Sequence, residues 1–494
     1  MSGIFNQVRI DQTRTEILSL SQSIKDWIDK RQAADIVGQH HTQLSVLKTV
    51  LTTALAKIET GLDAVSLTTP VQDLYATCRL LDRRVVWVRR VWDYYSSRFA
   101  QREDATLGKV LKAADEVVWS CYDEVFRNAK EQDDTLKRGT PPLPYIDLYY
   151  SPHAIPRAEP PPFLKSDVDA PFLQKFMQEL PIPIVGLPAV CLRSPWCLVS
   201  VGHEVGHHVL YDLLPNFELQ KTFGKLIRNA AYAASDKDSV VARRWEGWEK
   251  EIFADLFSIL CMGHWALWAI AELEVADLPT MFKSTTLYPA PVVRLSLMAH
   301  MLKALGLESV PTLGGMSLAE IVAAGEEAEV EDNVREAVSF DLCVAPAVAR
   351  AAVATPVGEL GSLKSLCGWD NEDFKPGGVV MALAEDLRDL NAAANPTLRA
   401  ARLYASSAVA AWVETTRDWD RKAADAEAAP DAEQRDEVRA ELAEHVLKVI
   451  GNSRVDGTRS AEKRAPAAEA ERLGIELGEM LLGLNPIVPG ETIR

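Results

Sequence analysis

Hydrophobic residues recur at spacings of three and four through most of this chain, which is the pattern of amphipathic helices. The longest such stripe in the N-terminal part consists of Leu44, Leu47, Leu51, Leu55, Ile58 and Leu62. Helical spacing returns beyond residue 311, and a final stripe predicts a helix over residues 469–484. The pattern therefore predicts a mainly α-helical protein with helical regions toward both ends.

The helical pattern is interrupted between residues 139 and 197. Residues 139–162 contain eight prolines in 24 positions, which excludes helix and predicts an extended strap. In residues 180–197, short apolar runs are broken by Gly and Pro, as is typical of edge strands. An ordinary loop packed against the next helix fits that stretch equally well. A small edge sheet would make the fold class mainly α (α+β).

These changes of pattern divide the chain into regions. A length of 494 residues also predicts more than one domain. We expect an N-terminal helical bundle (1–138), a proline-rich strap or linker (139–179), a central core (180–310) and a C-terminal helical region (311–494). The candidate chemistry lies in the central core.

Residues 194–215 predict one helix with both of its ends marked. Ser194 is a suitable N-cap, Pro195 suits the first helical position, and Pro215 prevents continuation. Within it, His203 and His207 are four residues apart, so their imidazoles converge on one face. That arrangement is half of a zinc site. The adjacent Glu204 is placed to accept a proton from a water held by the metal.

A second predicted helix, over residues 240–262, offers the third ligand. Glu251 and Asp255 are four residues apart on its apolar side, where an unpaired carboxylate would be costly. We expect Glu251 to complete a site of two histidines and one glutamate. Asp255 would accept a hydrogen bond from the far nitrogen of a ligand histidine and fix its tautomer. The alternative is a partly buried acidic pair on an ordinary helix.

With H-E-x-x-H on one helix and E-x-x-x-D on another, the sequence resembles the gluzincin zinc metallopeptidases. It is more narrowly similar to the family of CAAX prenyl proteases and heat-shock membrane proteases. Residues 251–255 loosely match that family's E-[YF]-x-A-D, and Pro289 and Arg294 match its H-P-x-x-x-x-R in spacing. Tyr288 stands in place of the family's histidine. The likeness covers about residues 181–305. The membrane helices of that family have no counterpart in this sequence.

This resemblance implies a zincin-like core flanked by the helical regions. It also implies roles for two further residues. Tyr288 would donate a hydrogen bond to the tetrahedral intermediate, and Arg294 would line the same cleft and help to stabilise the oxyanion. Metzincins are excluded, because Leu210 and Leu213 occupy the positions where that class has Gly and His.

Composition narrows the function classes further. A formal net charge of -17 argues against a nucleic-acid binder. Seven scattered cysteines, an odd number, predict reduced thiols in a cytoplasmic protein rather than a disulfide framework. The most apolar run, residues 256–271, is 16 residues long, whereas a membrane span needs about 20. The N-terminus has no apolar segment typical of a secretory signal.

Together these features predict a soluble zinc-dependent endopeptidase of the gluzincin type. His203, His207 and Glu251 would bind Zn²⁺, and Glu204 would act as the general base on a protein or peptide substrate. The helical flanks would shape the cleft or recruit a regulatory partner. The rival interpretation is a helical interaction or regulatory protein whose zinc site is structural or vestigial. Glu204 favours the enzyme, since a structural site needs no carboxylate beside its first ligand.

Overall fold

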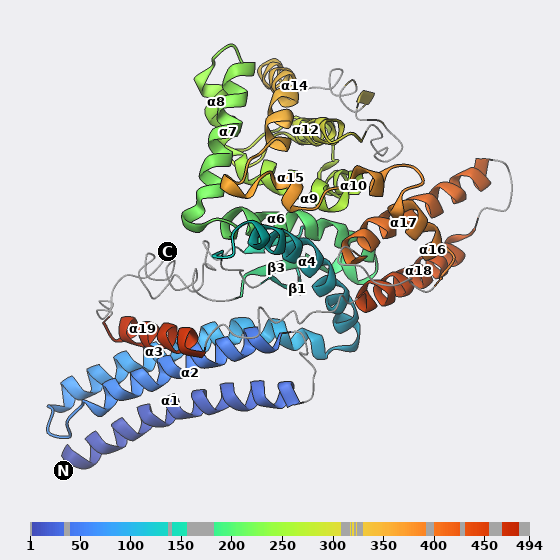
Figure 1. Cartoon of the computed structure of the whole chain (residues 1–494). Helices are drawn as coiled ribbons and strands as arrows, with labels where there is room; N and C mark the ends of the chain where they lie inside the picture. Colours follow the sequence, from blue (N-terminus) through green and yellow to red (C-terminus); the bar gives the residue numbers. More distant parts are fainter. Residues whose placement is uncertain are drawn as a thin grey trace. The chain divides into compact units, whose positions relative to one another are not determined.

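The computed structural model describes residues 2–33, 40–136, 141–155, 182–307, 317, 319–320, 323, 330–391, 400–424, 430–453 and 467–483. The protein is predominantly helical with a small three-stranded sheet, which confirms the predicted fold class (Figure 1). Contacts divide the chain into two compact units. The first comprises residues 1–104, 155–183 and 457–494, and the second comprises 105–154 and 184–456. The division into four regions stays a prediction.

Four long helices belong to the first unit. They are α1 (Ser2–Ala33), α2 (His41–Asp63), α3 (Val71–Ala100) and α19 (Ala467–Gly483), and η1 (Gln101–Glu103) follows α3. The apolar stripe predicted for residues 44–62 lies in α2, and its six side chains are fully buried. The predicted C-terminal helix is α19, which packs on α2. The approach is close, because a Cβ on Gly474 would lie 2.5 Å from the side chain of Thr53.

The second unit holds the sheet and the remaining helices. Its helical elements before residue 280 are α4 (Ala105–Gln132), η3 (Ala189–Leu192), η4 (Pro195–Ser200), α6 (Val201–Asp212), η5 (Pro215–Phe217), α7 (Glu218–Ala234), α8 (Ser239–Gly247), α9 (Glu249–Met262), α10 (His264–Glu274) and α11 (Leu278–Met281). The elements that follow α11 are α12 (Pro291–Ala304), α14 (Asp332–Val353), η6 (Gly358–Leu360), α15 (Leu363–Leu366), η7 (Asn371–Phe374), α16 (Val379–Arg388), α17 (Ala400–Ala424) and α18 (Ala432–Asn452).

The sheet has the order β1-β3-β2, with β1 (Leu143–Asp147), β2 (His153–Ile155) and β3 (Ile184–Pro188). The proline-rich strap supplies β1 and β2, and β1 pairs with β3 in parallel. Because β3 lies between them, the expected edge position of residues 180–197 is wrong, and the edges belong to the strap. β1 packs on α4 and β3 on α6, so the sheet lies beside the candidate site. Residues 139–140 and 156–179 of the predicted strap lie outside the described residues.

The two helices expected to carry the metal ligands both form, but each is divided. The first begins as η4 at Pro195 and becomes α-helical only from Val201, as α6. The second is α8 followed by α9. The break falls at Trp248, whose indole Nε1 donates to the carbonyl of Thr285 at 3.0 Å. Gly263 ends α9 in a conformation (φ 63°, ψ -146°) that a side chain would strain.

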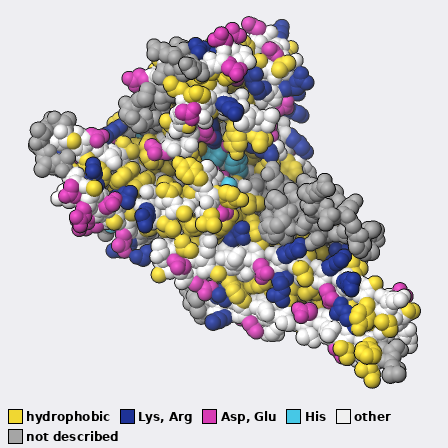
Figure 2. Space-filling model, turned by 180° about the vertical axis from the view of Figure 1, so that it is seen from behind, with side chains coloured by type: hydrophobic (Ala, Val, Ile, Leu, Met, Phe, Trp, Pro, Cys, Tyr) yellow, Lys and Arg dark blue, Asp and Glu magenta, His cyan; other side chains and the backbone are white. Residues whose placement is uncertain are grey.

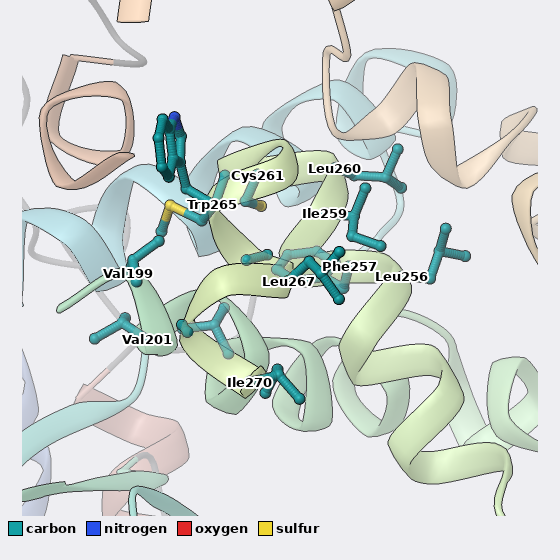
Figure 3. Close-up of a cluster of buried hydrophobic side chains, with 14 of the residues drawn as sticks. Val199, Val201, Leu256, Phe257, Ile259, Leu260, Cys261, Trp265, Leu267 and Ile270 are labelled. Atoms are coloured by element: carbon teal, nitrogen blue, oxygen red, sulfur yellow. The ribbon is translucent and has the colours of Figure 1, made fainter. Parts of the chain in front are cut away.

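The hydrophobic core of the second unit surrounds α9 (Figure 3). Leu256, Phe257 and Ile259 of α9 lie among side chains from η4, α6 and α10, and all three are fully buried. A helix buried on nearly every side holds the residues at its start in fixed positions. None of the helices in the described part of the chain combines the length and the hydropathy that crossing a bilayer requires.

Candidate metal centre

His203 and His207 of α6 and Glu251 of α9 bring three donor atoms together. The Nε2 atoms of the two histidines are 3.2 Å apart. Glu251 places Oε2 3.3 Å from His203 Nε2 and Oε1 3.6 Å from His207 Nε2. Tetrahedral zinc with bonds of about 2.0–2.1 Å separates its ligand atoms by roughly 3.3 Å. One ligand atom from each of the three residues lies within 4.8 Å of the other two, so the group could hold a metal ion, and two imidazoles with a carboxylate are ligands that zinc accepts.

A small-residue contact between α6 and α9 makes this spacing attainable. Gly206 lies within the H-E-x-x-H motif and faces Ala254, which lies within the E-x-x-x-D motif. A Cβ on Gly206 would come within 2.9 Å of Ala254 Cα. The two helix backbones are thus closer here than any larger residue would permit. Among the residues described, these donors form the one group of three or more His, Cys, Asp or Glu side chains whose ligand atoms converge.

Asp255 and Arg294 form a second layer of charged groups behind the donors. Nδ1 of His203 lies 2.9 Å from Oδ1 of Asp255, which leaves Nε2 directed toward the other donors. Arg294 of α12 binds Asp255 with two parallel donors, Nε and Nη2, each at 2.8 Å. Its Nη2 also lies 3.3 Å from Oε2 of Glu251. One buried guanidinium therefore orients both the carboxylate that holds His203 and the ligand carboxylate.

Glu274, at the end of α10, is a member of this network that the sequence did not indicate. Its Oε1 accepts a hydrogen bond from Arg294 Nη1 at 2.7 Å. The available signal was a pair of glutamates, Glu272 and Glu274, at the end of the apolar helix that starts at His264. With Asp255, Glu251 and Glu274 around it, Arg294 is compensated although it is only 4% exposed near the start of its helix.

Burial and neighbouring charges shift the pKa values of these residues in both directions. Burial opposes the charged form of His203, but the carboxylates of Asp255 and Glu251, at 2.9 and 3.3 Å from its ring nitrogens, outweigh it and raise the pKa of His203 to about 10. Burial lowers the pKa of His207 to about 4. Despite burial, nearby His207, His203 and Arg294 lower the pKa of Glu251 to about 2. Arg294 and His203 also hold the pKa of Asp255 well below its usual range despite burial, so Asp255 and Glu251 both remain ionised.

Glu204 differs from the other carboxylates of the site. It is 4% exposed, and burial raises its pKa to about 7. Charges on Glu251 and Asp255 act in the same direction, whereas His203 and Arg294 oppose the rise. No hydrogen bond to its carboxylate forms within the described ranges of the chain. Glu204 is therefore a carboxyl group that can both accept and release a proton near neutral pH.

Tyr288 lies at the solvent side of this network, in the loop between α11 and α12. Its ring centroid is 5.9 Å from Cζ of Arg294, and the side chain is 43% exposed. The charge on Glu251 is the largest of the causes that raise the pKa of Tyr288. The loop is ordered by Thr285, whose backbone N–H donates to the Tyr288 carbonyl at 2.9 Å and whose hydroxyl accepts from the Tyr288 N–H at 2.9 Å. The structure thus places Tyr288 and Arg294 at the site, and their catalytic roles stay predictions.

Access to the donors is on the side of His207. His203 and Glu251 are buried, whereas His207 is partly exposed. On the face shown in Figure 2, histidine side chains gather at one place and are bordered by hydrophobic side chains. A partly open donor is what a substrate-accessible metal centre requires, since a closed structural centre has no room for a further ligand.

No family model matches the chain, and no curated protein and no solved structure is significantly similar to it. The likeness to gluzincins therefore rests on the motif residues and on the geometry described above.

Proposed function

We propose that this chain is a zinc-dependent endopeptidase of the gluzincin type. The observation that carries the proposal is the triangle of His203, His207 and Glu251 donors with the carboxyl group of Glu204 beside it. A bound zinc ion would supply a Lewis acid and a water of lowered pKa. The other steps belong to residues of the chain itself.

Glu204 acts as the general base in this proposal. Its carboxylate takes the proton of the attacking water and then gives it to the leaving amine. A pKa of about 7 suits both transfers, because neither protonation state is strongly favoured at neutral pH. Tyr288 is the proposed hydrogen-bond donor to the carbonyl oxygen of the scissile peptide, since its exposed side chain lies near Arg294 and within the influence of the Glu251 charge.

Arg294 is better suited to positioning than to substrate binding. Three of its nitrogen atoms already donate to Asp255, Glu251 and Glu274 at 2.7–3.3 Å. Turning the guanidinium toward substrate would leave two buried carboxylates unpaired, which is costly. We therefore assign oxyanion stabilisation to Tyr288 and assign Arg294 to the support of Asp255 and Glu251.

The number of ligands favours catalysis over the rival interpretation of a structural or vestigial site. Structural zinc sites normally have four protein ligands, whereas catalytic sites have three and keep one position open. The residues described provide three donors. A structural site also gives no reason to bury a carboxyl group without a hydrogen-bond partner beside the first ligand.

Metal analysis of purified variants tests the ligand set. We expect about one zinc per chain in the wild type and a loss of most of it in Glu251→Gln. Glu249→Gln is a matched control. Glu249 is the first residue of α9, two residues before Glu251, and its carboxylate accepts a hydrogen bond from Gln220 at 2.8 Å instead of facing the histidines. Full zinc retention in Glu251→Gln would refute the ligand assignment.

Cleavage is tested by comparing new protein N-termini produced in cells that express the wild type or Glu204→Gln. The variant should keep its zinc, because Glu204 is not a ligand, and should lose turnover by about 10²–10⁴-fold. Identical sets of new N-termini, with zinc bound in both proteins, would support a structural metal site instead.

A further inference from the structure

The first unit carries a basic surface that the proposed peptidase chemistry does not use. On α3, Tyr75, Arg79, Arg83 and Val86 follow one another at spacings of four, four and three, so they share one helix face. Arg89 lies three residues beyond Val86. From Tyr75 to Arg89 the face extends for roughly 21 Å at 1.5 Å per residue. The three arginines are exposed, as are Tyr75 (38%) and Val86 (47%).

These arginines have no counter-ions of their own. None of Arg79, Arg83 and Arg89 forms an ion pair or hydrogen bond with any residue in the described ranges. Asp82 is the one acidic residue in the helix between them, and its carboxylate instead accepts from Arg9 and from the Thr13 hydroxyl of α1. Like charges at i and i+4, as in Arg79 and Arg83, slightly destabilise a helix. The face is therefore not arranged for the stability of the isolated protein.

The surface is also unusual for this chain, whose formal net charge is -17. In Figure 2, Lys, Arg, Asp, Glu and hydrophobic side chains are interspersed over the N-terminal helices, which are at lower left in Figure 1 and at lower right here. Arginine and tyrosine beside exposed aliphatic groups are the residue types that protein interfaces favour. This combination predicts that the exposed face of α3 binds another molecule and is not merely a solvated surface.

We propose that Tyr75, Arg79, Arg83, Val86 and Arg89 form a docking surface for an acidic polypeptide segment of a partner protein. The expected ligand is a helix with carboxylates and apolar side chains on one face, because that face complements both components of α3. Guanidinium groups bind carboxylates with two parallel hydrogen bonds, which gives direction as well as attraction. An anionic membrane is the other source of negative charge, and the experiment below distinguishes it from a polypeptide.

The test selects ligands from a random 16-residue peptide library displayed on phage, with the full-length protein as bait. We expect selected peptides to carry Asp or Glu at i and i+4 with apolar residues between them. In fluorescence anisotropy, the variant Arg79→Gln/Arg83→Gln/Arg89→Gln should bind such a peptide at least about tenfold more weakly, and salt should weaken binding to the wild type.

The control variant is Lys221→Gln/Lys225→Gln/Arg243→Gln, which removes three exposed cations from α7 and α8 and the same amount of charge. It should bind like the wild type. Selection of peptides without acidic residues, no selection at all, or equal losses in both variants would overturn the proposal. So would binding to vesicles that contain phosphatidylserine in place of peptide, if the arginine variant abolished it. Unfolding of the arginine variant, seen by circular dichroism, would instead show that these side chains are structural.

Discussion

The substitution Gly206→Ala probes how closely α6 and α9 must approach to build the metal centre. A Cβ at this position would lie 2.9 Å from Ala254 Cα and 3.0 Å from Phe257 Cβ. Carbon atoms in contact normally sit about 3.5–4.0 Å apart. The two helices must therefore separate locally by roughly 0.5–1 Å, because the atoms encountered are backbone or attached directly to it.

That displacement falls on the donor triangle, since its histidines come from α6 and its glutamate from α9. The distances of 3.3 and 3.6 Å between Glu251 and the histidines would lengthen, whereas a zinc site tolerates errors of about 0.2 Å. We expect zinc affinity to fall by about 10–100-fold or more. The fold should survive, because overpacking costs about 1–3 kcal/mol and replacing a helical glycine by alanine returns up to about 1 kcal/mol.

Gly202→Ala is the matched control, one turn earlier on the same helix. Its Cβ would meet Met262 Cγ at 3.2 Å and Ser258 Cα at 3.4 Å. The flexible methionine can move aside, so this variant should bind zinc like the wild type and be at least as stable. Zinc affinity is measured by competition with a chromophoric chelator, and folding by circular dichroism. A folded Gly206→Ala protein that binds zinc as tightly as Gly202→Ala would refute the close-approach argument.

Three further predictions concern single side chains. Asp255→Asn should weaken zinc binding by roughly 10–100-fold, and unchanged affinity would make Asp255 an ordinary helix residue. Tyr288→Phe should lower kcat on an identified substrate with little change in KM or zinc content, whereas an unchanged kcat would exclude its role as donor. Burial lowers the pKa of His264 to about 4, while the unfolded chain keeps about 6.5. The folded state thus binds fewer protons between these values, so stability present above pH 6.5 should fall by about 2 kcal/mol at pH 5. Urea unfolding of His264→Gln should lack that loss, and an equal loss in the variant would assign the effect to other groups.

The candidate metal-binding triad was predictable because each half of it is local in sequence. Helical spacing places His203 beside His207 and Glu251 beside Asp255, whatever the rest of the chain does. The approach of the two halves depended on Gly206 and on its neighbour in α9, and those small residues are also visible in the motifs. Glu274 was not predictable, because its contact with Arg294 comes from the packing of α10 against α12 and follows no spacing rule.

The errors about the fold have the same origin. The apolar stretch before the metal helix was expected at a sheet edge, but two strands from the proline-rich strap enclose it. Proline content does not explain this order, because β1 and β3 each contain one proline, Pro144 and Pro188, and β2 contains none. The break at Trp248 was likewise invisible, since its indole is drawn to the Thr285 carbonyl in a loop that follows 37 residues later. Pairing between distant segments decided both features.

The charges buried around the donors favour a divalent ion. Arg294 is one cation, and it faces the ionised carboxylates of Asp255 and Glu251 together with the less buried Glu274. Uncompensated buried charge is expensive, so a further positive charge is needed close to His203 and Glu251. The raised pKa of His203 shows that a proton meets this need in part. A proton brings one charge and is shared between two atoms, whereas a zinc ion would bring two charges and could bind a ligand atom from each of the three residues.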